Sequence, residues 1–125
     1  MERHVDVLGI LATLWGALAI LLAISMLLLA AGALAGLADP AWPGGALAAG
    51  LAGAFAVVGA FALAWGGVHV WAGALLRRRR PFGRVLMLAL GVINLLVLPF
   101  GTALGVYALW VLLANEVRRL FEPAR

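Results

Sequence analysis

The sequence has no cysteine, no lysine and few acidic residues. Without cysteine, the chain forms no disulfide, no thiolate metal site and no cysteine nucleophile. The five acidic residues all lie outside the long apolar runs, so the embedded carboxylate that a small proton-coupled exporter normally uses is missing. The sequence also contains no Ser-His-Asp set, carboxylate pair, phosphate loop or metal-ligand cluster. We therefore expect a protein that is not an enzyme and that binds neither a cofactor nor a metal.

Apolar residues, in contrast, are in large excess. Hydrophobic residues make up 66% of the 125 positions and charged residues 11%, whereas an ordinary soluble domain is roughly 45–50% apolar. A soluble fold of this size could not bury so much apolar surface. The apolar residues form uninterrupted runs that exceed the roughly 18 residues expected of a membrane-spanning helix. The sequence therefore predicts an integral membrane protein whose main partner is the lipid bilayer.

Arginine alone carries the positive charge. Nine arginines against five acidic residues give a formal net charge of +4. The arginines lie at the ends of the apolar runs, where anionic lipid headgroups would meet them. We interpret the charge as a signal of membrane topology and expect no nucleic-acid partner. The combination of abundant alanine, glycine and leucine with arginine in place of lysine suggests a bacterial protein of the inner membrane.

Turn residues and the arginine cluster divide the chain into four predicted helices. The first apolar run is longer than the 7–15 residues of a signal-peptide core, so we expect it to be retained as a spanning helix. Two prolines and a glycine pair in Asp39–Gly45 predict a tight loop after it. The fold expected is a single all-α transmembrane domain, residues 1–125, with two long helices followed by a shorter helical hairpin. The predicted helices are residues 7–38, 46–76, 82–98 and 101–120.

Residues 85–114 allow two interpretations, because Pro99, Phe100 and Gly101 fall in the middle of this apolar run. One interpretation is a single kinked span, which gives three spans in all. The other is a hairpin of two shorter helices, which gives four. With four spans every arginine lies on the same side of the membrane, as the positive-inside rule favours, whereas three spans would translocate the C-terminal arginines. We therefore predict four spans with both termini in the cytoplasm.

Small residues recur at heptad spacing in the second predicted helix. Helices in a bilayer associate through close backbone approach, which small residues permit, and a seven-residue repeat fits a left-handed crossing. The first helix has a weaker repeat at Gly9, Gly16, Ala23 and Ala30. We expect these faces to pack helices together and to join copies of the chain in a homo-oligomer. The candidate helix-packing residues are Gly45, Ala52, Gly59, Gly66 and Gly73.

His69 and Asn94 are the two polar residues most worth examining within the apolar runs. His69 lies eight residues before Arg77 and Asn94 ten residues after Arg84, about 12 and 15 Å deep at the rise of an α-helix. The two side chains therefore lie at a similar depth. One interpretation is a structural interhelical hydrogen bond, and another is a proton relay or pore-lining pair. A single imidazole is a poor metal site, because a first shell needs further ligands.

The arginines between the two halves of the chain have two interpretations as well. They are a topology signal and membrane anchor by the positive-inside rule, and they are also candidate contacts for anionic lipid headgroups. The residues are Arg77, Arg78, Arg79, Arg80 and Arg84.

Both ends of the chain carry a resemblance to a known group of proteins. It rests on the stretch PFGTALGVYALWVLL at residues 99–113, on Asn94, and on Arg3-His4-Val5 leading into Leu8-Gly9-Ile10-Leu11. These features resemble small uncharacterised bacterial four-span membrane proteins, a group with no assigned activity. The resemblance implies a hairpin built around Pro99, with Thr102 and Tyr107 as further polar groups that bond across helices.

These observations favour a non-enzymatic scaffold or accessory subunit of the membrane. The alternatives are an oligomeric channel lined by weakly polar residues such as Thr13, Ser25, His69 or Asn94, and an anionic-lipid-binding membrane protein held by the arginine cluster. The sequence leaves all three open.

Overall fold

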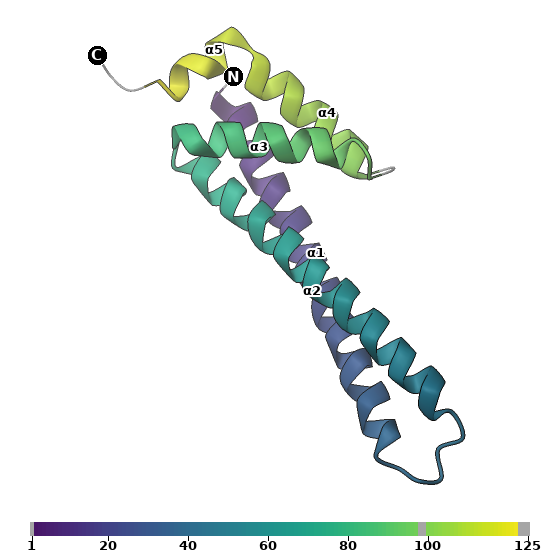
Figure 1. Ribbon diagram of the computed structural model, residues 1–125. Helices are drawn as coiled ribbons and strands as arrows, with labels where there is room; N and C mark the ends of the chain where they lie inside the picture. The colour runs from purple at the N-terminus through teal and green to yellow at the C-terminus, as the bar shows by residue number, and fades with distance from the viewer. Residues whose placement is uncertain (1, 98–99, 123–125) are drawn as a thin grey trace. The chain divides into compact units, whose positions relative to one another are not determined.

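A computed structural model describes residues 2–97 and 100–122, and these residues form helices and no strand (Figure 1). The all-α class expected from the sequence is therefore confirmed for the described residues. Two of the helices, α1 and α2, are long and apolar enough to cross a membrane, and two shorter apolar helices have 14 residues each. The helices are α1 (Glu2–Leu37), α2 (Gly45–Arg77), α3 (Pro81–Asn94), α4 (Phe100–Leu113) and α5 (Asn115–Leu120).

The chain divides into two compact units. Unit 1 comprises the described residues of 1–16 and 68–125, and unit 2 comprises residues 17–67. The division falls inside α1 and α2, so each long helix contributes one part to each unit. Unit 1 contains both polar candidates and all the arginines of the cluster, so the candidate site belongs to this unit. The single transmembrane domain expected from the sequence stays a prediction.

In unit 1, α1 and α2 approach each other at two glycines. A Cβ atom added to Gly73 would lie 2.6 Å from the carbonyl oxygen of Gly9 and would also collide with the hydroxyl of Thr13. A Cβ atom on Gly9 would lie 3.2 Å from the carbonyl oxygen of Gly73. The backbones of α1 and α2 are therefore in direct contact at Gly9 and Gly73. Any residue with a Cβ atom at these positions would prevent such a close approach.

Unit 2 has a second contact of this kind, two heptads after Gly9 in α1 and two heptads before Gly73 in α2. A Cβ atom on Gly59 would lie 3.2 Å from the carbonyl oxygen of Ala23 and 2.9 Å from Cγ of Leu27. Gly9 and Ala23 are two heptads apart in α1, and Gly59 and Gly73 are two heptads apart in α2. The heptad spacing of small residues thus corresponds to close helix contacts in both units.

The heptad series of α2 is buried along most of its length. Ala52, Gly59, Gly66 and Gly73 are buried, and so are Gly9, Gly16, Ala23 and Ala30 of α1. Gly45 differs, because it is the exposed first residue of α2, where an added Cβ atom would be 4.0 Å from the side chain of Leu37.

In unit 1, α3 and α4 form a hairpin rather than one kinked helix. A Cβ atom on Gly105 would lie 2.5 Å from the carbonyl oxygen of Gly91, and one on Gly91 would lie 3.4 Å from Cβ of Ala108. The hydroxyl of Thr102 donates to the carbonyl oxygen of Leu95 at 2.9 Å, which joins the start of α4 to the turn after α3. Leu98 and Pro99, around which the sequence predicts the hairpin, lie outside the described residues.

Three helix boundaries differ by more than one residue from those expected. α1 begins at Glu2 rather than at residue 7, and the acidic side chain in its first turn is favourable near the positive end of the helix dipole. α3 ends at Asn94 rather than at residue 98, because the chain turns there and the carbonyl groups of Leu95 and Val97 pair with Thr102. The last predicted helix, 101–120, is divided into α4 and α5 by Ala114, whose ψ of 132° is extended.

Candidate functional site

The described part of the chain buries two polar side chains, His69 in α2 and Asn94 at the end of α3. Both have 0% exposure. The amide nitrogen Nδ2 of Asn94 lies 2.8 Å from ring nitrogen Nε2 of His69, a hydrogen-bond distance. Because an amide nitrogen donates and does not accept, Nε2 is the acceptor in this contact. The bond ties α2 to α3 inside unit 1.

Only one of the two polar atoms of the Asn94 side chain is hydrogen-bonded within the described residues. Its oxygen, Oδ1, is buried and has no hydrogen-bond partner within the described residues. Leaving a buried acceptor unpaired costs about 1–3 kcal/mol, which offsets part of what the bond to His69 contributes. The contact therefore serves as a tie between helices more than as a source of stability.

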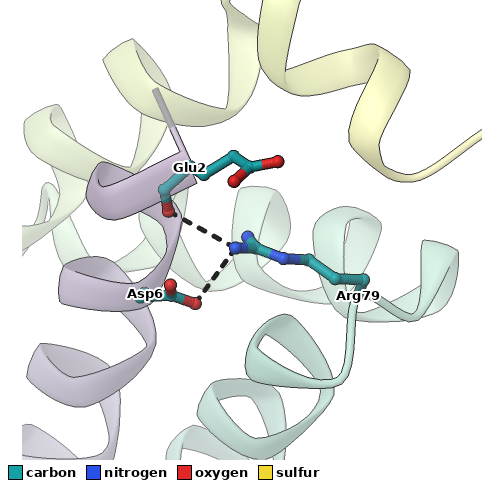
Figure 2. A network of polar contacts seen from close by, with 3 residues as sticks. All are labelled: Glu2, Asp6 and Arg79. Atoms are coloured by element: carbon teal, nitrogen blue, oxygen red, sulfur yellow. Dashed lines mark hydrogen bonds and ion pairs between the residues drawn. The ribbon is translucent and has the colours of Figure 1, made fainter.

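The first turn of α1 meets the end of α2 through Arg79 (Figure 2). The guanidinium nitrogen Nη2 of Arg79 lies 3.1 Å from the carboxylate oxygen of Asp6 and 3.4 Å from the carbonyl oxygen of Glu2. The side chain of Arg79 is 29% exposed and that of Asp6 52%. Such a partly hydrated ion pair contributes roughly 0.2–1 kcal/mol, so its main effect is to fix the position of the arginine.

Arg79 lies in the turn that follows α2 and has an unusual backbone conformation. Its φ of 55° is left-handed, a region that glycine normally occupies at a helix end. The amide of Arg80 donates to the carbonyl of Leu75, and the amide of Arg79 to that of Leu76, both at 3.0 Å. This is the hydrogen-bond pattern of a Schellman motif. A residue with a side chain costs about 1–2 kcal/mol in this conformation.

Two further contacts bring the end of α4 to the same place in unit 1. Ring nitrogen Nδ1 of His4 lies 3.1 Å from the hydroxyl of Tyr107, and the His4 ring meets Trp110 edge-on with 5.5 Å between ring centroids. Nε of Arg84, in the first turn of α3, donates to the carbonyl oxygen of Leu112 at 3.0 Å. The start of α1, the end of α2, the start of α3 and the end of α4 are thus joined to one another.

The structure separates the five arginines of the predicted cluster into two kinds. Arg79 and Arg84 are half-buried and bonded to other helices. The remaining three are exposed, and in the part of the chain that the structure describes they make no hydrogen bond or ion pair. These are Arg77, Arg78 and Arg80.

Two residues of these contacts, His4 and Asp6, are not among the sites predicted from the sequence, whereas Tyr107 is one of the polar groups that the resemblance implies bond across helices. His4 and Tyr107 are 103 residues apart, and no local pattern pairs them. The signal that could have found them is topological, because an even number of antiparallel helices brings the first turn of the first helix beside the last turn of the fourth.

Chemically, the arrangement offers hydrogen-bond donors, acceptors and one buried imidazole. Among residues 2–97 and 100–122, no group of three histidine, aspartate or glutamate side chains is placed to hold a metal ion. No family model matches the sequence, and neither a curated protein nor a solved structure matches it.

Proposed function

We propose that the protein is a small polytopic protein of a bacterial inner membrane with a non-enzymatic scaffold or accessory role, akin to the small four-span membrane proteins that its ends resemble. One contrast carries the membrane assignment. Only 11% of the most apolar 18-residue stretch of α1 is buried, and 22% of that of α2. Large side chains such as Leu28, at 68% exposure, face outwards. The core helix of a soluble protein is mostly buried, so these side chains need another cover, which a bilayer provides.

The proposed topology has four spans with both termini in the cytoplasm. The contacts among the ends of α1, α2, α3 and α4 support it, because they hold Asp6, Arg79 and Arg84 together in one unit. Charged groups that cluster in this way remain hydrated together on one face of a membrane. Arginines on that face are retained in the cytoplasm during insertion.

The scaffold role is supported by where the polar side chains point. His69 and Asn94 are bonded to each other and fully covered inside unit 1. The hydroxyls of Thr13 and Ser25 donate to carbonyl oxygens of their own helix, at Gly9 and Leu21. A channel needs such groups on a shared water-filled path, so their local pairing favours a scaffold over a channel.

The homo-oligomer is a further part of the proposal. On α2, Gly53, Ala60 and Gly67 form a second heptad series that is exposed, and Cβ atoms added to the two glycines would meet nothing within 4 Å. On α1 the exposed large hydrophobic residues are mostly leucines. A face of small residues allows a second helix to approach closely, whereas a leucine face suits lipid, so the second copy binds through α2.

The test combines extraction with reconstitution. Membranes that contain the protein are washed with alkaline carbonate, which strips peripheral proteins, and the purified chain is then placed in phosphatidylcholine liposomes. We expect the protein to stay in the carbonate pellet and to give no ion flux above that of protein-free liposomes. Release by carbonate would contradict the membrane assignment. Reproducible selective currents would contradict the scaffold role and favour the channel.

A further inference from the structure

An exposed aromatic pair lies close in the sequence to the exposed arginines of unit 1. Trp71 of α2 and Phe82 of α3 are 52% and 55% exposed, and their ring centroids are 5.6 Å apart. Arg78 directly follows the last residue of α2, and its amide still donates to the carbonyl oxygen of Ala74, four residues earlier. Because it lies seven residues after Trp71, it continues the side of the helix that carries Trp71. The surface therefore combines cationic groups with an apolar aromatic platform.

Arg79 and Arg84 are committed to internal contacts. Arg79 is held by Asp6 and Glu2 despite the cost of its left-handed backbone. Arg84 satisfies the carbonyl of Leu112, one of the last four carbonyls of α4 that have no partner in their own helix. Each of these two guanidinium groups therefore bonds to another helix of the protein.

The other three arginines are available to an external anion. Arg77, Arg78 and Arg80 are exposed and unpaired within the described chain. The aliphatic part of the Arg77 side chain packs over Gly9, because a Cβ atom added to Gly9 would lie 2.9 Å from Cγ of Arg77. This packing holds the first part of the arginine side chain in place. Guanidinium groups bind phosphate through two parallel hydrogen bonds.

We infer that Arg77, Arg78 and Arg80, together with Trp71 and Phe82, bind the headgroup of an anionic phospholipid. The arginines contact the phosphate, and the aromatic pair lies along the glycerol and upper acyl chain. The phosphate could belong to a free phosphate ion or to a lipid headgroup, and the aromatic pair favours the lipid. A free phosphate ion makes no favourable contact with apolar rings, whereas aromatic rings are favoured at the level of lipid headgroups. This inference rests on the proposed membrane location.

The experiment measures which lipids stay with the protein. The full-length chain is reconstituted in vesicles of equal parts phosphatidylglycerol and phosphatidylcholine, extracted in mild detergent and purified, and the retained lipids are quantified by mass spectrometry. We expect phosphatidylglycerol to be enriched over phosphatidylcholine. An arginine near an anionic surface gives about a fivefold preference, so each single substitution of Arg77, Arg78 or Arg80 by Gln should lower the ratio by up to that factor.

The matched control removes the same charge elsewhere. The triple variant R77Q/R78Q/R80Q should retain the two lipids in equal amounts, whereas R3Q/R118Q/R119Q should keep the wild-type ratio. Equal losses in both triple variants would overturn the site, because the preference would then follow net charge alone. W71L/F82L, which keeps all arginines, should also lower the ratio, and an unchanged ratio would overturn the role of the aromatic pair.

Two further readouts separate the possible failures. Inorganic phosphate is titrated into protein reconstituted with phosphatidylcholine alone, and binding that R77Q/R78Q/R80Q abolishes would identify a phosphate site in place of a lipid site. Carbonate extraction is carried out on every variant. If the wild type stays in the membrane but shows no lipid preference, the lipid site fails and the membrane assignment stands, whereas release of the wild type contradicts the membrane assignment itself.

Discussion

The amide nitrogen of Asn94 lies 2.8 Å from Nε2 of His69, and this hydrogen bond between α3 and α2 is fully buried. Asn94 is also the residue at which α3 ends. The contact therefore fixes the end of the shorter helix against the longer one, while Oδ1 of the same amide has no hydrogen-bond partner among the residues that the structure describes.

Substitution of both partners should cost less than substitution of one. Asn94→Leu leaves Nε2 of His69 buried without this donor and should destabilise the protein by about 1–2 kcal/mol. His69→Leu alone leaves Nδ2 of Asn94 without this acceptor and should cost a similar amount, whereas His69→Leu with Asn94→Leu removes both polar groups and should approach the wild type. Unfolding in a mixed-micelle titration with SDS measures the three variants. A double variant that loses the sum of the two single losses would show that the pair is not coupled.

Gly73 should not tolerate even one added carbon. In Gly73→Ala the new Cβ meets the carbonyl of Gly9 at 2.6 Å and the Thr13 hydroxyl, so α1 and α2 must separate at a cost of about 1–3 kcal/mol. Gly50→Ala is the matched control on the same helix, because a Cβ atom there meets nothing within 4 Å. It should be neutral or slightly stabilising. The same SDS titration compares them, and equal stabilities would contradict the close crossing.

Because the backbone of Arg79 is left-handed, glycine should be tolerated better than alanine at this position. Arg79→Ala loses the ion pair with Asp6 and keeps the strain, whereas Arg79→Gly loses the ion pair and relieves the strain. The glycine variant should therefore be more stable than the alanine variant by about 1 kcal/mol. Thermal unfolding in detergent measures the difference, and an alanine variant as stable as the glycine variant would argue against a left-handed Arg79.

The absence of cysteine makes the topology directly measurable. Single cysteines at Ala41, Val97 and Glu122 are labelled in intact cells with a maleimide that does not cross membranes. We expect labelling at Ala41 and Val97 from outside, and at Glu122 only after the cells are opened. Protection of Val97 in intact cells would show that the α3–α4 hairpin turns back within the membrane.

The exposed face of small residues on α2, formed by Gly53, Ala60 and Gly67, should control the association of two copies of the chain. Gly53→Leu with Gly67→Leu places bulky side chains on this face and should shift the protein towards monomer in light scattering of the detergent-solubilised chain. Gly32→Leu changes an equally open glycine on α1 and should leave the oligomer intact. Dissociation by Gly32→Leu alone would move the interface to α1.

Sequence patterns accounted for the helices and for the level of the buried pair. Helix rise from the arginines placed His69 and Asn94 at similar depths, and the structure has them in contact. Heptad spacing gave the face of α2 that includes Gly59 and Gly73, because close packing in helices depends on side-chain size, which a sequence records directly.

Other features depend on geometry that local sequence does not record. An arginine in a left-handed helix cap has no sequence signature, because glycine is the usual residue there and Arg79 is held by Asp6, 73 positions away. The end of α3 at Asn94 depends on Thr102 in the next helix. The helix breaks at Ala114, whose backbone is extended although alanine is a strong helix former. The carbonyl oxygen of Leu112 accepts a hydrogen bond from Arg84 instead of from the next turn of the helix.

The unequal helix lengths have a consequence for the surrounding lipid. α3 and α4, with 14 residues each, reach about 21 Å, whereas α1, with 36 residues, reaches about 54 Å. The hydrocarbon layer is roughly 30 Å thick. If the hairpin spans the bilayer, as the proposed four-span topology requires, the bilayer thins beside it, while α1 tilts or projects beyond the acyl chains. Lipids with short acyl chains fit the thinned zone best, so the protein would sort its neighbours by chain length as well as by headgroup.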